Sequence, residues 1–262
     1  MARSALLNVM TQAVRKIGRN LARDYGEIEN LQVSLKGPGG FVAAAGRKAE
    51  KSLVEELARV RPGYGLFSAE VEETGADTSH RWLVDPAMGL VNFLHGLPHF
   101  GLSLALERSG QIVAGVIYNP ATDDLFTAEK GTGAFLNDRR LRVAARRELA
   151  DTVIGTLLPD LTQGDHRRHQ AELRQVSANV SGVRAFGAPA LDVAYVAAGR
   201  LDGAFMTGLQ PWQIAAAVLM VKEAGGFVTD YAGRDKAVES GEVVCGNEDV
   251  RARLAELLAK AA

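Results

Sequence analysis

The chain has 262 residues, of which 47% are hydrophobic, enough for one large domain or two small ones. Its 30 basic and 31 acidic side chains nearly cancel, so no overall charge calls for a nucleic acid or a membrane as partner. Cys245 is the single cysteine, which excludes an internal disulfide framework. No apolar run approaches the roughly 20 residues that cross a bilayer, and no signal-peptide core is seen. We therefore expect a cytoplasmic protein.

The first half of the chain predicts two helices followed by strands. Apolar residues at three- and four-residue steps predict an amphipathic helix from Leu6 to about Gly26, and a second helix from about Ala45 to Val60. Alternating or short apolar runs predict strands at 31–35, 64–67, 82–84, 100–107, 112–118 and 123–129. The glycines of segment 130–135 invite comparison with a phosphate-binding loop, but no helix follows them. A hairpin turn is the better prediction there.

The second half alternates between strands and helices. Strands are predicted at 153–156, 183–185, 203–206, 227–230 and 243–245, and helices at 166–178, 190–198, 214–224 and 249–260. This alternation is typical of a layered α/β arrangement. We expect an N-terminal half, 1–150, and a C-terminal half, 151–262, that pack as one compact unit.

One segment, 82–96, combines features that are informative together. Its sequence is WLVDPAMGLVNFLHG. An apolar strand delivers Asp85 at its end, Pro86 fixes the chain direction, and Gly89 permits a tight turn. A carboxylate followed by such a turn suits a metal ion or a phosphate, although a strand followed by a plain polar turn would give the same pattern.

The segment resembles the signature of the inositol monophosphatase family, Mg²⁺-dependent phosphatases that also act on related sugar phosphates. That signature reads Asp-Pro-(Ile/Leu)-Asp-Gly-Thr-x-Asn-Phe, and its matching residues here are Asp85, Pro86, Gly89, Asn92 and Phe93. Three further segments, 125–135, 187–203 and 211–226, are similar to other parts of the family pattern. The resemblance implies an αβαβα layered sandwich, usually assembled as a homodimer.

The resemblance also assigns roles to individual positions. Asp85 matches a bridging metal ligand, and Ala87 matches a residue that binds metal through its backbone carbonyl. The first ligating Glu aligns with Ala69, which leaves its neighbour Glu70 as a residual candidate ligand. Two further Asp ligands are replaced, by Met88 and Gln213.

The positions that serve the water and the substrate differ as well. The Thr that holds the nucleophilic water is Leu90, and its partner Asp is Gly46. A substrate-contacting Glu is Met206, so Gly89, Leu90 and Met206 mark the expected phosphate or substrate pocket.

These departures share one direction, since each loses a carboxylate or a hydroxyl. The positions are Gly46, Ala69, Met88, Leu90, Met206 and Gln213. Residues that shape the fold are kept. The sequence thus predicts a family member that is catalytically inactive or severely impaired, holds no cofactor tightly, and has a binding or regulatory role. A thioether is too soft for Mg²⁺, which prefers oxygen ligands.

Two alternatives stay open at this point. The first is an active Mg²⁺-dependent inositol-1-monophosphatase that hydrolyses inositol or sugar phosphate monoesters, with ligands drawn from Glu70, Glu72 and Asp192. The second is a protein that binds a neutral or anionic small molecule, such as a small phosphorylated ligand, in the altered pocket.

The remaining candidates have simpler interpretations. His95 and His99 are predicted to be loop residues, and His166 and His169 surface residues. Cys245 is predicted to be a buried small hydrophobe. The acidic run Glu70, Glu72, Glu73 and Asp77 is predicted to be a solvated loop rather than a residual cation site.

A basic segment, 139–149, carries five arginines: Arg139, Arg140, Arg142, Arg146 and Arg147. A solvated face is the simplest interpretation. The alternative is a contact surface for an acidic partner. Some bacterial proteins that resemble this one act as partners of the transcription machinery.

Overall fold

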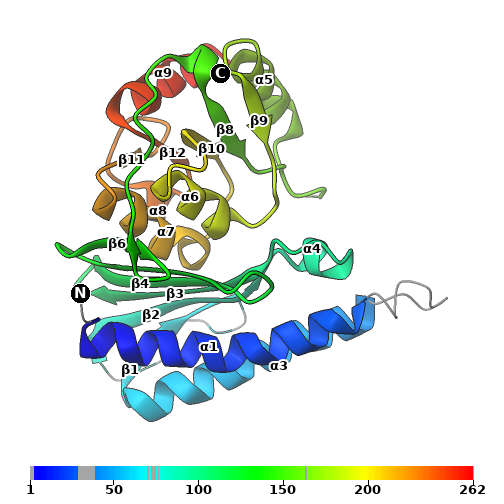
Figure 1. Ribbon diagram of the computed structural model, residues 1–262, viewed down its shortest axis with the longest axis vertical. Helices are drawn as coiled ribbons and strands as arrows, with labels where there is room; N and C mark the ends of the chain where they lie inside the picture. Colours follow the sequence, from blue (N-terminus) through cyan, green and yellow to red (C-terminus); the bar gives the residue numbers. More distant parts are fainter. Residues whose placement is uncertain are drawn as a thin grey trace.

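The computed structural model describes residues 3–28, 39–69, 71, 75, 77–162 and 164–261. Five layers follow one another in it, helices alternating with sheets (Figure 1). The αβαβα sandwich expected from the sequence is confirmed as a mixed α+β layered fold. The predicted strand at 31–35 and the candidate ligand Glu70 lie outside the described residues.

The outer helical layer consists of α1 (Ala5–Gly26) and α3 (Gly39–Val60). Ser4 caps α1 by accepting a hydrogen bond from the backbone N–H of Leu7 at 3.1 Å. One face of α1, including Met10, Val14 and Ile17, is buried against the first sheet, as the three- and four-residue periodicity predicts.

The first sheet has seven strands in chain order: β1 (Tyr64–Phe67), β2 (Asp77–Met88), β3 (Gly101–Arg108), β4 (Gln111–Asn119), β5 (Asp124–Glu129), β6 (Gly133–Leu136) and β7 (Arg139–Arg140). Strands β1 and β2 run parallel, and the others pair antiparallel. Both faces of the sheet are covered. On β4, Val116 therefore packs toward α1 and α3, while Ile117 packs toward the opposite core.

The central helical layer consists of α6 (Pro189–Ala197) and α7 (Pro211–Glu223), which lie between the two sheets (Figure 1). Helix α7 lies so close to β4 that a Cβ atom added to Gly115 would be only 2.9 Å from Cα of Ala216. The short helix α8 (Ala237–Ser240), which the sequence did not predict, packs beside α7.

The second sheet has the order β11-β12-β10-β8-β9. Its strands are β8 (Val153–Thr156), β9 (Gly182–Arg184), β10 (Gly203–Met206), β11 (Phe227–Thr229) and β12 (Val243–Gly246). Helices α5 (His166–Ser177) and α9 (Glu248–Ala259) cover its outer face, where a third apolar core lies. The division of the chain near residue 150 stays a prediction.

No helix among the described residues is both long enough and apolar enough to span a bilayer.

Candidate functional site

A cavity of about 800 Å³ opens where the signature segment meets the second half of the chain. One wall is formed by the end of β2 and the short helix α4 (Leu90–Leu94). The other walls come from the loop after β8, the start of α5, the first residues of α6 and α7, and the connection between α8 and β12. The fold thus brings the predicted signature turn to a concave surface of small-molecule size.

The backbone of the signature turn is tightly constrained. Strand β2 continues through Asp85 to Met88, with an irregular register against β3 at that point, so Asp85 lies within the strand rather than at its end as predicted. Gly89 follows with φ of +72°, and a Cβ atom there would lie 2.8 Å from the carbonyl oxygen of His99. Only glycine fits this turn without strain.

The inner side of the turn is anchored by Asn92 and Phe93. The Asn92 amide nitrogen donates to the carbonyl oxygens of His99 at 2.7 Å and Phe186 at 2.6 Å. Phe93 is buried and makes an edge contact with Phe100. Because Phe186 belongs to the second half of the chain, Asn92 fixes the position of the turn relative to that half.

Asp85 is the one signature carboxylate that remains, and it faces the cavity. Burial raises its pKa to about 7; the backbone N–H of Ala87, 3.3 Å from Oδ1, opposes this shift, and the negative charge of Glu50 adds to it.

Glu50 is the residue of this region that the sequence analysis missed. It is buried on α3 and accepts a hydrogen bond from the Ser68 hydroxyl. It lies four residues after Gly46, so both occupy the same face of α3. That spacing is the signal that would have revealed it.

The substituted positions make one wall of the cavity apolar. A Cβ atom on Gly46 would lie 3.6 Å from Leu90 Cδ1 and 3.9 Å from Ala87 Cβ, so Gly46 and Leu90 lie side by side. The aliphatic side chain of Leu90 at the cavity is 37% exposed, whereas Met88, which also lines the cavity, is buried. Ala69 is exposed and does not line the cavity.

Gln213, Met206 and Asp192, to which the sequence assigned possible site roles, have structural roles as well. The Gln213 side-chain oxygen accepts a hydrogen bond from the backbone N–H of Gln210 at 2.8 Å and so caps α7. Met206 is buried in the core at the end of β10, and its neighbour Thr207 lines the cavity instead. Asp192, a ligand in the active-enzyme alternative, is buried away from the cavity and lies 2.7 Å from His99 Nε2.

The opposite wall carries charge. Asp160, Asp165 and Glu242 line it together with Arg168. The Arg168 guanidinium is already paired, at 2.8 Å with Glu172 and 3.4 Å with Glu242. The neighbouring His169 is 7% exposed, and its ring stacks on Phe205, so the prediction of a surface histidine is wrong.

The described side chains around the signature turn do not by themselves fit Mg²⁺. Across the described parts of the chain, no group of three or more His, Cys, Asp or Glu side chains is arranged to hold a metal ion. Mg²⁺ needs several oxygen ligands around one point, and the signature turn offers Asp85 and the Ala87 carbonyl. Each missing carboxylate removes several kcal/mol of attraction, even at an effective dielectric near 20.

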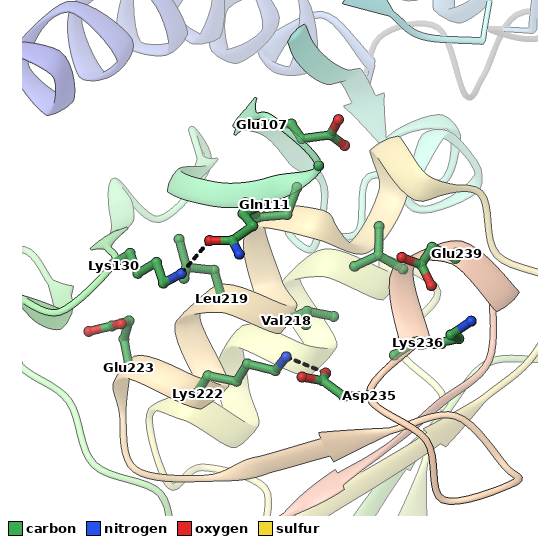
Figure 2. Close-up of a pocket in the computed structure, with 14 residues that line it drawn as sticks. Glu107, Gln111, Lys130, Val218, Leu219, Lys222, Glu223, Asp235, Lys236 and Glu239 are labelled. Atoms are coloured by element: carbon green, nitrogen blue, oxygen red, sulfur yellow. Dashed lines mark hydrogen bonds and ion pairs between the residues drawn. The ribbon is translucent and has the colours of Figure 1, made fainter. Parts of the chain in front are cut away.

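A second cavity of about 490 Å³ lies between α7, α8 and the first sheet (Figure 2). Lys222 is paired with Asp235 at 2.5 Å, and Lys130 donates to the Gln111 side chain at 2.6 Å. The Glu223 carboxylate accepts the backbone N–H groups of Gly131 and Gly133. A phosphate-binding loop would hold its ligand with such N–H groups, but here they are bound by Glu223. Strands β5 and β6 pair antiparallel on either side of the turn, which confirms the predicted hairpin.

The basic segment divides into two parts. Arg146 lies 2.6 Å from the buried carboxylate of Asp202, and Arg147 lies 3.3 Å from Asp249. Arg139, Arg140 and Arg142 are exposed.

Comparison with known proteins supports the class defined by this fold and signature turn. The chain matches the inositol monophosphatase family over residues 2–262, and it belongs to that family. It is 58% identical over 264 residues to the inositol-1-monophosphatase of Mesorhizobium japonicum (99% of this chain, 98% of the relative). It is 37% identical over 263 residues to the Nus factor SuhB of Xylella fastidiosa (96% of this chain, 94% of the relative).

The crystal structure of the extragenic suppressor protein SuhB from Bartonella henselae shares the fold. Its TM-score is 0.90 at 54% identity, with coverage of 99% of this chain and 100% of that one.

Proposed function

We propose that this protein is a family member without effective phosphatase activity, whose altered cavity serves binding or regulation. The observation that carries the proposal is the composition of the cavity wall at the signature turn. Asp85 stands there with Met88, Leu90 and the side-chain-free Gly46, where the resemblance implies a set of acids and a hydroxyl. In the family, bound Mg²⁺ supplies positive charge to the phosphoryl oxygens and activates a water. Here Met88 and Gln213 replace two of its Asp ligands and Ala69 replaces its first Glu, so no cofactor is expected to bind tightly.

The test is phosphate release from inositol 1-phosphate with saturating Mg²⁺. We expect a rate at least a hundredfold below about 1–10 s⁻¹, an ordinary enzymatic turnover. A rate within tenfold of that range would overturn the proposal.

The second candidate function is an active Mg²⁺-dependent inositol-1-monophosphatase. The name of the Mesorhizobium japonicum relative favours it, at 58% identity over nearly the full length of both chains. Its ligands would have to include groups other than those at Met88, Leu90 and Gln213. The same assay separates the two candidates, since only this one predicts turnover that disappears when Mg²⁺ is chelated.

A protein partner connected with transcription is the binding role that a relative suggests. The Xylella fastidiosa relative is named a Nus factor, and exposed arginines on this chain offer an anionic contact surface. Because Arg146 is engaged with buried Asp202, the surface would consist of Arg139, Arg140 and Arg142. Purification of the tagged protein with and without these three charges tests the role, and unchanged co-purifying proteins would contradict it.

Homodimerisation, which the resemblance implies, is proposed as well. Light scattering during size-exclusion chromatography should give twice the chain mass of 27.9 kDa. A mass near 27.9 kDa at micromolar concentration would contradict it.

A further inference from the structure

Helix α5 is held on the second sheet by few buried side chains. Among its described residues, those that are buried are His169, Glu172 and Val176. Two of these three side chains titrate, at positions where a helix usually buries aliphatic residues. A helix with so little apolar contact separates from its sheet at a small cost in free energy. Its attachment is therefore sensitive to the protonation of the two titratable groups.

His169 makes the contact with the sheet. Its ring stacks on that of Phe205 on β10, with 6.2 Å between the ring centroids. Phe205 lies in the third apolar core, and its neighbour on β8 is the uncharged Thr156. The Nε2 atom of His169 is buried and has no hydrogen-bond partner among the described residues. The core accepts a neutral imidazole at this place, whereas a second proton would bring an uncompensated charge into it.

The two carboxylates of this region are already bound. Glu172, three residues after His169, accepts hydrogen bonds from Arg168 Nε at 2.8 Å and from the Tyr231 hydroxyl at 3.4 Å. Glu242, between α8 and β12, lies 3.4 Å from Arg168 Nη2. Burial raises the pKa of Glu172, and the hydrogen bond from Arg168 opposes this shift. Acid therefore favours Glu172 where it lies, so a loss of attachment in acid has to come from His169.

The other elements packed against α5 do not supply a carboxylate to the ring either, as far as the chain is described. The acidic residues of α9 are exposed or, in Asp249, paired with Arg147. Arg184 on β9 is exposed and basic. The residues that α9 contributes to the third core are aliphatic: Val250, Leu254, Leu257 and Leu258.

The direction of the pH effect follows from these surroundings. Burial lowers the pKa of His169, and the positive charge of His166, one turn earlier, adds to this shift. When α5 leaves the sheet, His169 regains a pKa near its ordinary value of 6.5 and binds the proton more tightly. The attachment of α5 is therefore strongest above pH 6.5 and weakens as the pH falls below that value.

Helix α5 also carries part of the cavity wall at the signature turn. Asp165 caps the helix by accepting a hydrogen bond from the backbone N–H of Arg168 at 2.9 Å, and both residues line the cavity. His169 follows them directly. We propose that proton uptake by His169 releases α5 from the second sheet and so opens the cavity wall that Asp165 and Arg168 line. The opening changes the shape of the cavity whatever the cavity binds, and it does not depend on the loss of phosphatase activity.

Hydrogen exchange tests the proposal on the wild-type protein. Protection factors of the backbone amides, corrected for the effect of pH on the intrinsic exchange rate, are measured at pH 7.5 and pH 5.5. We expect the amides from Arg168 to Val176 to lose protection about five- to tenfold at pH 5.5, because the released His169 binds its proton near pH 6.5. Amides of α1, in the outer layer on the far side of the molecule (Figure 1), should change by less than about twofold.

Two variants on α5 identify the responsible group. His169→Phe keeps an aromatic ring against Phe205 but cannot take up a proton, so the protection of α5 should be the same at both pH values. The matched control His166→Gln removes an exposed histidine and keeps a side-chain N–H donor for the Asp160 carbonyl, which lies 2.9 Å from His166 Nε2. The pH dependence of the wild type should persist in this variant.

Protection of α5 that does not change with pH in the wild type would overturn the inference, and so would an undiminished pH dependence in His169→Phe. An equal loss of protection in α1 and α5 would also overturn it, since acid would then unfold the whole protein. An NMR titration of the His169 ring in the wild type decides the matter if His169→Phe does not fold. A pKa below 6.5 supports the inference, and a pKa of 6.5 or above contradicts it.

Discussion

The two sides of the segment from Asp85 to Phe93 make different kinds of contact. On the inner side, Asn92 donates to two backbone carbonyls and Phe93 is buried among aromatic rings. On the cavity side, Met88 and Leu90 present hydrocarbon, and burial raises the pKa of Asp85 to about 7. The inner side holds the fold together, and the cavity side faces open space. One side can therefore change its chemistry while the other continues to hold the backbone in place.

Restoring the cavity side should have the largest effect. We expect the combined variant Gly46→Asp, Ala69→Glu, Met88→Asp, Leu90→Thr and Gln213→Asp to release phosphate from inositol 1-phosphate at least about 10²-fold faster than the wild type, because it regains metal ligands and a group that positions water. Mg²⁺ should raise its melting temperature and leave that of the wild type unchanged. Adding Asp85→Asn to the variant should abolish both gains. Equal rates of phosphate release for the variant and the wild type would contradict the idea that the residues on the cavity side limit the activity.

Removing the anchor on the inner side should destabilise the fold. Asn92→Ala leaves the carbonyls of His99 and Phe186 without their donor, so we expect the free energy of unfolding to fall by about 3 kcal/mol. Urea titration measures the change. The neighbouring Val91→Ala, at a position 70% exposed, is the matched control and should stay within about 0.5 kcal/mol of wild type. A loss below about 1 kcal/mol for Asn92→Ala would show that the two sides differ less than we infer.

Asp85 should make stability depend on pH. Its pKa is about 7 in the folded protein against an ordinary value of 3.8, so the folded state holds the proton more tightly. The resulting stabilisation is complete below about pH 3.8 and is lost as the pH rises toward and through 7. Relative to Asp85→Asn, we expect the wild type to lose about 2 kcal/mol between pH 5 and pH 8. Urea titrations of both proteins at the two pH values measure this, and a difference independent of pH would mean that the carboxyl ionises normally.

Substitutions in the arginine segment should have the smallest effects on stability. Arg146 and the pair Arg139 and Arg140 should nevertheless differ from each other. Arg146→Ala leaves the buried Asp202 carboxylate without its cation and should cost about 2 kcal/mol. Replacing exposed Arg139 and Arg140 together by Ala should change stability by less than about 0.5 kcal/mol. Thermal unfolding compares the two variants. Similar losses for both would argue that the whole segment is structural.

Contacts between distant segments account for what the sequence analysis missed. Met206 aligns with a substrate-contacting position, yet it packs in the core while Thr207 reaches the cavity. Asp192 was considered as a metal ligand, but His99 approaches it from the loop before β3. His169 has polar sequence neighbours, and burial against Phe205 follows only from the packing of α5 on the second sheet. For Asp192 and His169 the deciding neighbour is far away along the chain.

The sequence by itself determined the family, the order of nearly all helices and strands, and the hairpin at 130–135. Those features depend on local periodicity, turn residues and a linear motif, which can be read along one chain. Only the tertiary structure decided that Leu90 faces Gly46, that Glu50 lies near Asp85, and that one cavity gathers aliphatic and acidic side chains from both halves of the chain. The physical reason is that burial and charge at a site are set by side chains from several layers, which meet only when the layers pack.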